Sequence, residues 1–459
     1  MLAAATERLR PAVERALSKG RRTVVSVTAE IGGLDPSAAV FASRLASDRW
    51  FCWEQPDRGF ALAALGVAHE VSSRGADRFR DLAGDSLSIE LTADEPTGLP
   101  AGAGAVWVGG MAFDPDGGAT APWSSLSPAS LALPELSICR SAATTFLTLN
   151  AMVRPGEDPE KILARMEGRL TGLRTDSLPM LDPHPDGVEI SSVRPPEDFE
   201  RMIEAATGRI AAGEMSKVVL AREILVRASS AHDPAALFGA LREQFASCFC
   251  FCCGTPEAAF LGASPELLLR RSGASLSTVA LAGSTRRSSD PAVDDHLGEQ
   301  LLRSDKDRRE HAIVAERIGR TLRPHSVWVE TAPEPEIVKV SNIQHLATPI
   351  VAQLAEPRSA VELAGLLHPT PAVGGEPRGT AAKAIAELEE MDRGRYAGPV
   401  GWMDATEDGE FCVALRSALL RDREARLYAG VGIVAGSDPA AELAETEIKL
   451  GALLPLLAE

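Results

Sequence analysis

The chain has 459 residues, of which 45% are hydrophobic and 24% are charged, so it is long enough and apolar enough to bury a large core. Its formal net charge of −17 argues against a general surface for nucleic acid or for an anionic membrane, and leaves room for a small anionic substrate in a locally positive site. No apolar run reaches the roughly 18 residues that a membrane span needs.

The first part of the chain predicts a surface helix, then short strands, then a second helix. Residues 1–22 are amphipathic and Arg-rich, but their two glutamates and the lack of a Ser-rich stretch argue against a transit peptide. Between residues 21 and 149, short apolar stretches alternate with Gly, Pro and Asp turns, and several have the period of two that favours antiparallel strands. Residues 155–173 predict a helix, and the Pro- and Asp-rich residues 178–196 predict a linker across the surface.

The second part predicts an amphipathic helix at residues 197–212 and many further strands. The apolar run 246–254, which carries four of the seven cysteines, predicts a buried strand in which the thiols act as small hydrophobic groups. An odd number of cysteines in a long chain fits a reducing cytoplasm. Because strands outnumber helices, we expect an α+β protein with large antiparallel sheets.

An acidic helix face is predicted near the C-terminus. Glu442, Glu445 and Lys449 are spaced at i, i+3 and i+7, so they share one face of a helix that Asp438 and Pro439 are expected to begin. Such a face can hold a hard cation and an anionic ligand together. The alternative is a solvated face with an ordinary Glu–Lys salt bridge.

A second acidic pair, Asp307 and Glu310, opens another predicted helix. Two helices that each offer a carboxylate pair suit Mg²⁺, which takes few protein ligands and keeps several waters. The alternative for this pair is acidic charge that stabilises the N-terminal end of the helix dipole.

From about residue 193 onward, a series of segments resembles the chorismate-utilising enzymes, a family of isochorismate, salicylate, anthranilate and aminodeoxychorismate synthases. The segments occur in the family's order and include SKVVLAR (216–222), FLGASPELLL (260–269), ALAGSTR (280–286), SDKDRREH (304–311), HPTPAVGG (368–375), YAGPVGWMD (396–404) and ELAETEIK (442–449). The resemblance implies one α+β unit of two large facing antiparallel β-sheets with outer helices. Residues 1–195 would then be a family-variable part of that fold, and residues 196–459 the chorismate-binding catalytic region.

The resemblance also implies a base and an acid. Lys217 stands where the isochorismate and salicylate branch carries a lysine that activates water, and a lysine held among apolar residues near a cation can act as a base. Glu266 resembles the general acid that protonates the departing 4-hydroxyl group. The alternatives are a lysine that faces solvent at a strand edge and a glutamate paired to Arg270 or Arg271.

Further site residues follow from matching positions. Glu310 and Glu445 resemble direct Mg²⁺ ligands, and Glu442 and Asp307 resemble an acidic pair that acts through waters, although the family often has Glu at the position of Asp307. The remaining residues resemble a carboxylate clamp (Arg416 and Lys449) and other substrate contacts (Gly283, Ser284, His345, Tyr396 and Gly432). The alternatives are turn geometry alone for the glycines and a hydrogen-bonded core histidine for His345.

Within the family, the segments favour an isochorismate synthase. The stretch at residues 280–285 lacks the nucleophilic lysine of the aminodeoxychorismate branch, and residues 368–375 resemble isochorismate synthases more than salicylate synthases. We expect a cytoplasmic, Mg²⁺-dependent monomer that acts on chorismate without a glutamine amidotransferase subunit, for menaquinone or siderophore biosynthesis. Salicylate synthase and a non-catalytic chorismate-binding homologue are the alternatives.

Overall fold

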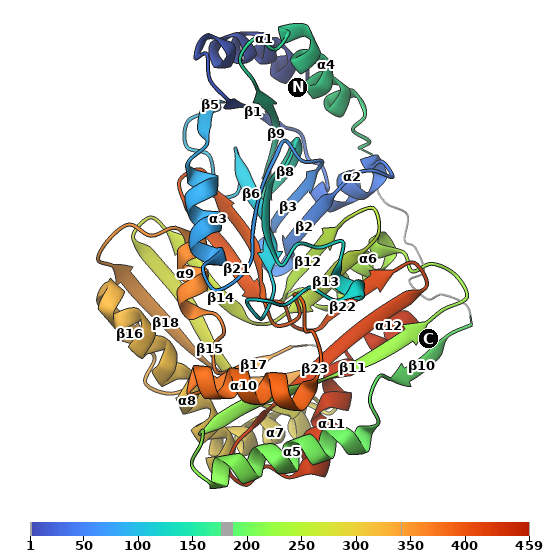
Figure 1. Ribbon diagram of the computed structural model, residues 1–459, viewed down its shortest axis with the longest axis vertical. Coiled ribbons are helices and arrows are strands. Elements are labelled where there is room, and N and C mark those ends of the chain that lie inside the picture. The colour runs from blue at the N-terminus through green and yellow to red at the C-terminus, as the bar shows by residue number, and fades with distance from the viewer. Residues whose placement is uncertain (1, 176–186, 341, 459) are drawn as a thin grey trace.

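A computed structural model describes residues 2–175, 187–340 and 342–458, and two large β-sheets form its centre (Figure 1). The larger sheet has 13 strands. Their order is β10 (Glu189–Ser192), β11 (Lys217–Arg227), β23 (Glu424–Ile433), β22 (Ser417–Arg421), β13 (Ala259–Ser264), β12 (Phe249–Gly254), β2 (Trp50–Gln55), β3 (Phe60–Leu65), β8 (Leu136–Ser141), β9 (Thr144–Val153), β1 (Thr23–Ile31) and β5 (Glu90–Asp94), with β19 (Gly375–Glu376) paired to β11.

The second sheet has 10 strands. Their order is β16 (Ser326–Thr331), β18 (Ile343–Leu354), β15 (Ser275–Arg286), β14 (Leu267–Ser272), β21 (Gly409–Val413), β20 (Pro399–Asp404), β6 (Val106–Met111), β7 (Ala129–Leu133) and β4 (His69–Ser73), with β17 (Glu336–Lys339) paired to β18. The predicted α+β class with two large antiparallel sheets is confirmed. One pair departs from it, because β1 and β5 run parallel.

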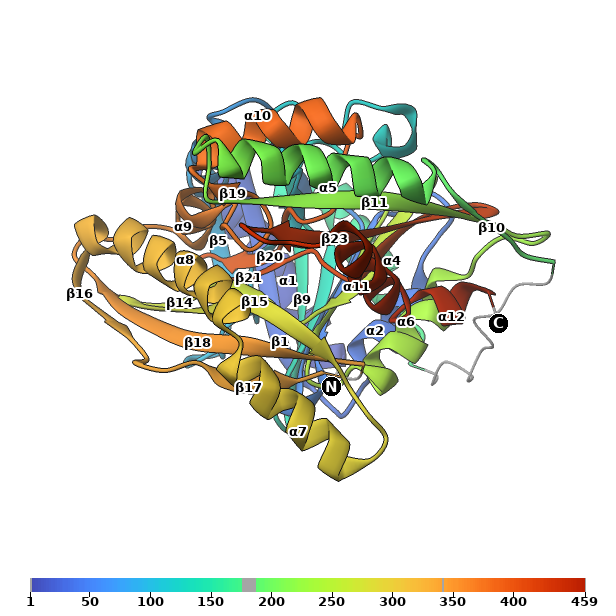
Figure 2. The same ribbon diagram turned by 90° about the horizontal axis from the view of Figure 1, so that it is seen from below.

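The helices lie on the outside of the sheets. Figure 2 shows α8 (Asp305–Leu322) beside β15, and α5 (Pro196–Ala211) and α11 (Pro439–Leu450) beside β11 and β23. At the other end of the molecule, α1 (Leu2–Ser18) and α4 (Pro159–Thr171) pack together over β1 and β9 (Figure 1). The other helices are α2 (Pro36–Ser43), α3 (Arg78–Leu87), α6 (Pro234–Gln244), α7 (Pro291–Arg303), α9 (Ala360–Leu367), α10 (Arg378–Glu389) and α12 (Leu454–Ala458). No helix of the described residues is long and apolar enough to cross a membrane.

Strand β12 is buried on both faces, which explains why its sequence is continuously apolar. Phe251 and Cys253 belong to the core shared by the two sheets, whereas Cys250 and Cys252 belong to the core between the larger sheet and its outer helices. Successive side chains on a strand point to opposite faces, so a strand buried on both faces has no polar positions. The prediction that these cysteines are buried hydrophobic groups is confirmed, since all seven thiols of the chain are free and buried.

Part of the predicted linker at residues 178–196 forms a β-strand. Residues 176–186 lie outside the described part of the chain, but Glu189–Ser192 forms the edge strand β10, which pairs antiparallel with β11. Both sheets contain strands from residues 1–195 and from residues 196–459. The division of the chain at residue 195 stays a prediction.

Candidate active site

A cavity of about 70 Å³ lies where β11 and β23 of the larger sheet meet β15, α8 and α11. Ten of the predicted site residues line it: Glu266, Gly283, Ser284, Glu310, His345, Tyr396, Arg416, Gly432, Glu445 and Lys449. Lys217, Asp307 and Glu442 lie outside its lining. The ten lining residues come from segments up to 183 positions apart (Glu266 to Lys449), so their convergence depends on the packing of both sheets.

Lys217 begins β11 directly behind this lining. Its side chain is fully buried, and its Nζ lies 3.0 Å from Glu310 Oε1. The pair is electrostatic only, because the ammonium group makes no hydrogen bond of acceptable geometry. A buried ammonium group without an acceptor is unfavourable, so Lys217 Nζ is available to donate a hydrogen bond to a small polar molecule.

Gly432 creates the space for this pair. It is opposite Val219 in the register of β11 and β23. A Cβ atom at residue 432 would lie 2.1 Å from Glu310 Oε1 and 3.0 Å from Lys217 Cε. Any larger residue would therefore push the carboxylate and the ammonium apart.

Glu266 follows β13 and is buried beside the same cavity. Burial raises its pKa to about 8, although the Lys217 charge opposes the rise. A carboxyl group with this pKa is mostly protonated at neutral pH and can donate a proton. The two predicted catalytic residues are thus close enough to interact electrostatically, and the acid is held in its protonated form.

Arg416 supplies an unpaired positive charge to the cavity. Its Nη2 lies 3.1 Å from His345 Nε2, and it forms no ion pair with a carboxylate of the described residues. Burial and the neighbouring Arg416 charge lower the pKa of His345 well below its usual range, so the ring is neutral and accepts this hydrogen bond. Arg416 also has a φ of 47°, a left-handed conformation that costs a non-glycine residue energy and often occurs at functional sites.

Lys449, by contrast, is already paired. Its Nζ lies 2.8 Å from Glu445 Oε1 and donates to the carbonyl of Gly430, and Ser284 Oγ donates to the same Glu445 oxygen at 2.7 Å. Burial alone would raise the pKa of Glu445, but Lys449 and Ser284 outweigh it and lower that pKa. The helix that carries both residues begins as predicted, since the Asp438 side chain accepts from the backbone N–H of Ala441.

The strand β15 bends at Gly283, which has a φ of 75° and lies at a register shift against β18. A Cβ atom there would lie 3.2 Å from the Cβ of Asp307, so glycine allows the first turn of α8 to approach the strand. The first two turns of α8 carry Asp307 and Glu310 beside the cavity, and Ser304 caps the helix by accepting from the backbone N–H of Asp307.

The four predicted metal-binding carboxylates lie close enough to repel one another. Burial raises the pKa of Asp307, and Glu310 and Glu445 raise it further. Burial also raises the pKa of Glu442, where Glu445 adds to the effect although the ion pair with Lys306, 2.6 Å long, opposes it.

Lysines, however, take up three of these carboxylates. Glu310, Glu442 and Glu445 are paired with Lys217, Lys306 and Lys449 respectively. In the described ranges no three His, Cys, Asp or Glu side chains converge into a preformed metal site. The donors are nevertheless all hard oxygen atoms of the kind that Mg²⁺ prefers.

Two residues of the cavity wall were not predicted from the sequence, the aromatic Tyr428 and the basic Arg393. Tyr428 lines the cavity and stacks on Tyr396 with ring centroids 5.1 Å apart, and buried Arg393 lies beside them. The chain has only two tyrosines, and both line this one cavity. That scarcity, together with the related tetrapeptides RYAG and LYAG, was a signal that could have identified Tyr428.

Comparisons with known proteins match nearly the whole chain. The sequence model described as chorismate binding enzyme matches residues 11–458. The chain is 32% identical over 458 residues to isochorismate synthase MenF of Bacillus subtilis (strain 168), covering 97% of this chain and 96% of that relative. It is 36% identical over 453 residues to the salicylate biosynthesis isochorismate synthase of Pseudomonas aeruginosa, covering 97% and 93%. The solved structure of MenF, the menaquinone-specific isochorismate synthase of Escherichia coli, superposes with a TM-score of 0.79 at 28% identity, covering 98% of this chain and 99% of that one.

Proposed function

The chain belongs to the chorismate-binding enzyme family, and we propose that within this family it is a magnesium-dependent isochorismate synthase. Once Lys217 has released its own proton, its neutral amine takes a proton from water as the water oxygen bonds to ring carbon C2 of chorismate. The ring double bonds shift, the bond from C4 to its hydroxyl oxygen breaks, and Glu266 gives a proton to the departing oxygen, which leaves as water. One water enters and one leaves, so substrate and product are isomers.

The observation that carries this proposal is that Lys217 and a protonated Glu266 lie beside the same cavity. Adding water at one ring carbon while a hydroxyl group leaves from another requires one base and one acid in the same complex. Burial holds the pKa of Glu266 at about 8, and the fully buried Lys217 has no hydrogen-bond acceptor of its own. General acid–base catalysis of this kind contributes roughly 10²–10⁴-fold to a rate.

The substrate's carboxylates need positive partners. Arg416 has a free guanidinium edge beside the cavity, and its planar fork matches the two oxygens of a carboxylate. Lys449 would have to exchange its pair with Glu445 for a substrate oxygen. Tyr396, His345, Gly283 and Ser284 would complete the contacts.

Glu310 and Glu445 would hold Mg²⁺ directly, with Glu442 and Asp307 acting through waters. The mutual repulsion of these carboxylates supports a bound cation, and the lysine partners would have to release them. When bound, Mg²⁺ would offset the charge of the ring carboxylate and orient the ring.

We also propose that the protein works as a cytoplasmic monomer without a glutamine amidotransferase subunit. Relatives named as isochorismate synthases match the chain over nearly its whole length, and its seven thiols are free.

Product analysis tests the proposal. Purified protein incubated with chorismate and Mg²⁺ should form isochorismate, as separated by chromatography, and EDTA should abolish turnover until Mg²⁺ is restored. Salicylate and pyruvate as products would make the chain a salicylate synthase, and binding of chorismate without any product would make it a non-catalytic homologue. Full activity in metal-free buffer would contradict the magnesium assignment alone.

A further inference from the structure

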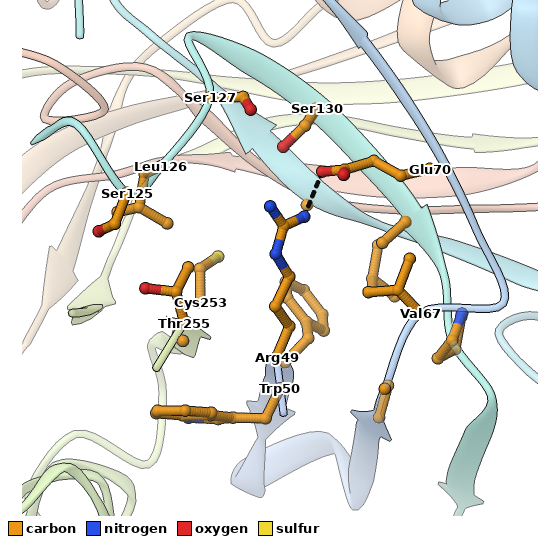
Figure 3. Close-up of a pocket in the computed structure, with 18 of the residues that line it drawn as sticks. Arg49, Trp50, Val67, Glu70, Ser125, Leu126, Ser127, Ser130, Cys253 and Thr255 are labelled. Atoms are coloured by element: carbon orange, nitrogen blue, oxygen red, sulfur yellow. Dashed lines mark hydrogen bonds and ion pairs between the residues drawn. The ribbon is translucent and has the colours of Figure 1, made fainter. Parts of the chain in front are cut away.

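A second cavity lies away from the substrate cavity, between the start of β2, β4, the β6–β7 pair and the end of β12. Its volume is about 60 Å³, which leaves room for about four water molecules. Figure 3 shows the Arg49 guanidinium in this cavity, with Glu70, Ser127 and Ser130 around its tip and the Trp50 ring at the opposite end.

A buried guanidinium without a counter-ion lines this cavity. Arg395 is 3% exposed, and its Nη2 donates to the carbonyl of Ser127 at 3.0 Å and to Ser130 Oγ at 2.9 Å. Its buried Nε has no hydrogen-bond partner, and no carboxylate of the described residues forms an ion pair with it. An arginine keeps its charge in a protein, so an unneutralised positive charge stays buried here.

The neighbouring groups do not cancel that charge. The only carboxylate of the lining, Glu70, is paired with Arg49. Burial raises the pKa of the adjacent Cys253 thiol to about 11, so the thiol is neutral. Two guanidinium groups and one carboxylate leave the cavity with a net positive charge, in a chain whose net charge is −17.

The remaining lining limits the ligand. Ser125 Oγ is buried without a hydrogen-bond partner and can donate to an acceptor. Val67, Val108 and Leu126 form apolar walls. The lining has one surplus positive charge, apolar walls and a small volume. Together they fit a monoanion with a short hydrocarbon part.

We propose that this cavity is a binding site for a small monocarboxylate, of the size of acetate or propionate, whose oxygens are held by Arg395 and Arg49. Arg395 precedes Tyr396, which lines the substrate cavity, so the two cavities share the turn at residues 393–397. The proposal concerns binding alone and does not depend on the reaction that the substrate cavity performs.

Titration calorimetry and thermal unfolding with acetate test the proposal on the full-length protein. Acetate should bind saturably and raise the unfolding temperature. Arg395→Met should weaken acetate binding by at least about tenfold, the loss expected for charge-assisted hydrogen bonds. Val67→Phe, which narrows the cavity and leaves both arginines in place, should weaken it similarly and covers the case in which the arginine variant folds poorly.

Arg78→Met is the matched control. Arg78 is also 3% exposed and donates to backbone carbonyls, but it does not line this cavity, so its loss should change acetate affinity by less than about twofold. Absence of saturable acetate binding to the wild-type protein would mean that the cavity holds water only and would overturn the proposal. So would acetate binding that is lost in an Arg416→Met variant and kept in Arg395→Met, because the ligand would then occupy the substrate cavity. Tighter binding of inorganic phosphate than of acetate would overturn the choice of a monocarboxylate.

Discussion

Two buried glutamates close to the same cavity have opposite surroundings. Glu389, at the end of α10, forms an ion pair with Arg393, and both side chains are about 1% exposed. The backbone N–H of Ala221 also donates to Glu389, and Arg393 donates to the carbonyls of Val373 and Val219. The pair is therefore fully satisfied, and it ties the turn before Tyr396 to strand β11.

Glu266 has no such partner. It forms no ion pair within the described residues, and Lys217, whose charge lowers its pKa most, is paired with Glu310 instead. Burial raises the pKa of both glutamates, but Glu389 is held in an ion pair, whereas Glu266 forms none within the described residues and lines the substrate cavity. The partners of a buried carboxyl group, and not its burial alone, decide whether it can take part in proton transfer.

The largest expected effect breaks the satisfied pair. Arg393→Met leaves Glu389 buried with an uncompensated charge, so the free energy of unfolding should fall by about 3–5 kcal/mol, as measured by urea denaturation. The double variant Glu389→Gln/Arg393→Met removes both charges and should recover part of the loss. Equal losses in the single and double variants would show that the carbonyl contacts of Arg393, and not the ion pair, stabilise this region.

Substitutions of the two proposed catalytic residues, Lys217 and Glu266, should lower the reaction rate. Lys217→Ala removes the proposed base, and Glu266→Gln keeps the size of the side chain but cannot donate a carboxylic proton. Each should lower kcat by about 100-fold or more, in a steady-state assay with chorismate. Both variants should bind chorismate with near-normal affinity, because Arg416 is intact. If Lys217→Ala loses affinity and rate together, Lys217 is a substrate anchor and the base lies elsewhere.

The contrast between the two glutamates could not have been predicted from the sequence. Sequence patterns located the buried strand at residues 246–254 and the helix that begins after Asp438, because apolar runs and capping are local signals. The resemblance to a family supplied Glu266 as a candidate acid. Neither source placed Glu389 and Arg393 as a buried pair, since the contacts that satisfy them come from strands distant in the sequence.

Some features of the fold could not be predicted from the sequence either. The two antiparallel sheets follow from many local strand patterns, but the parallel pairing of β1 with β5 and the edge strand at Glu189–Ser192 depend on neighbours that no local pattern specifies. Likewise, the spacing of acidic residues on α8 and α11 indicated two carboxylate pairs, but it gave no sign that Lys306 pairs with Glu442.

A smaller effect, on chorismate affinity, is expected from a change at Arg416. Arg416→Lys keeps the positive charge and loses the planar fork, so chorismate binding should weaken by about 1–3 kcal/mol in a calorimetric titration. Arg426→Lys is a suitable control, because Arg426 is paired with Glu223 and does not line the substrate cavity. Unchanged affinity in Arg416→Lys would show that Arg416 does not contact the substrate.

The smallest effect concerns pH and follows from the state of Glu266. With a pKa of about 8, this carboxyl group loses its proton as the pH rises through 8, and kcat/KM should then fall about tenfold per pH unit. The residual activity of Glu266→Gln should lack this decline, and a decline with the same midpoint in that variant would assign the titration to another group.

Stability gives an independent measurement with a defined sign. The folded-state pKa of about 8 lies above the ordinary value of 4.5, so the unfolded chain releases the Glu266 proton first as the pH rises. The contribution of Glu266 to stability is therefore fully present below pH 4.5 and is lost progressively up to pH 8. Relative to the wild type, Glu266→Gln should become steadily more stable across that window and change no further above it. A difference in unfolding free energy that stays constant from pH 4.5 to pH 8 would mean that Glu266 is already ionised in the folded protein across this window.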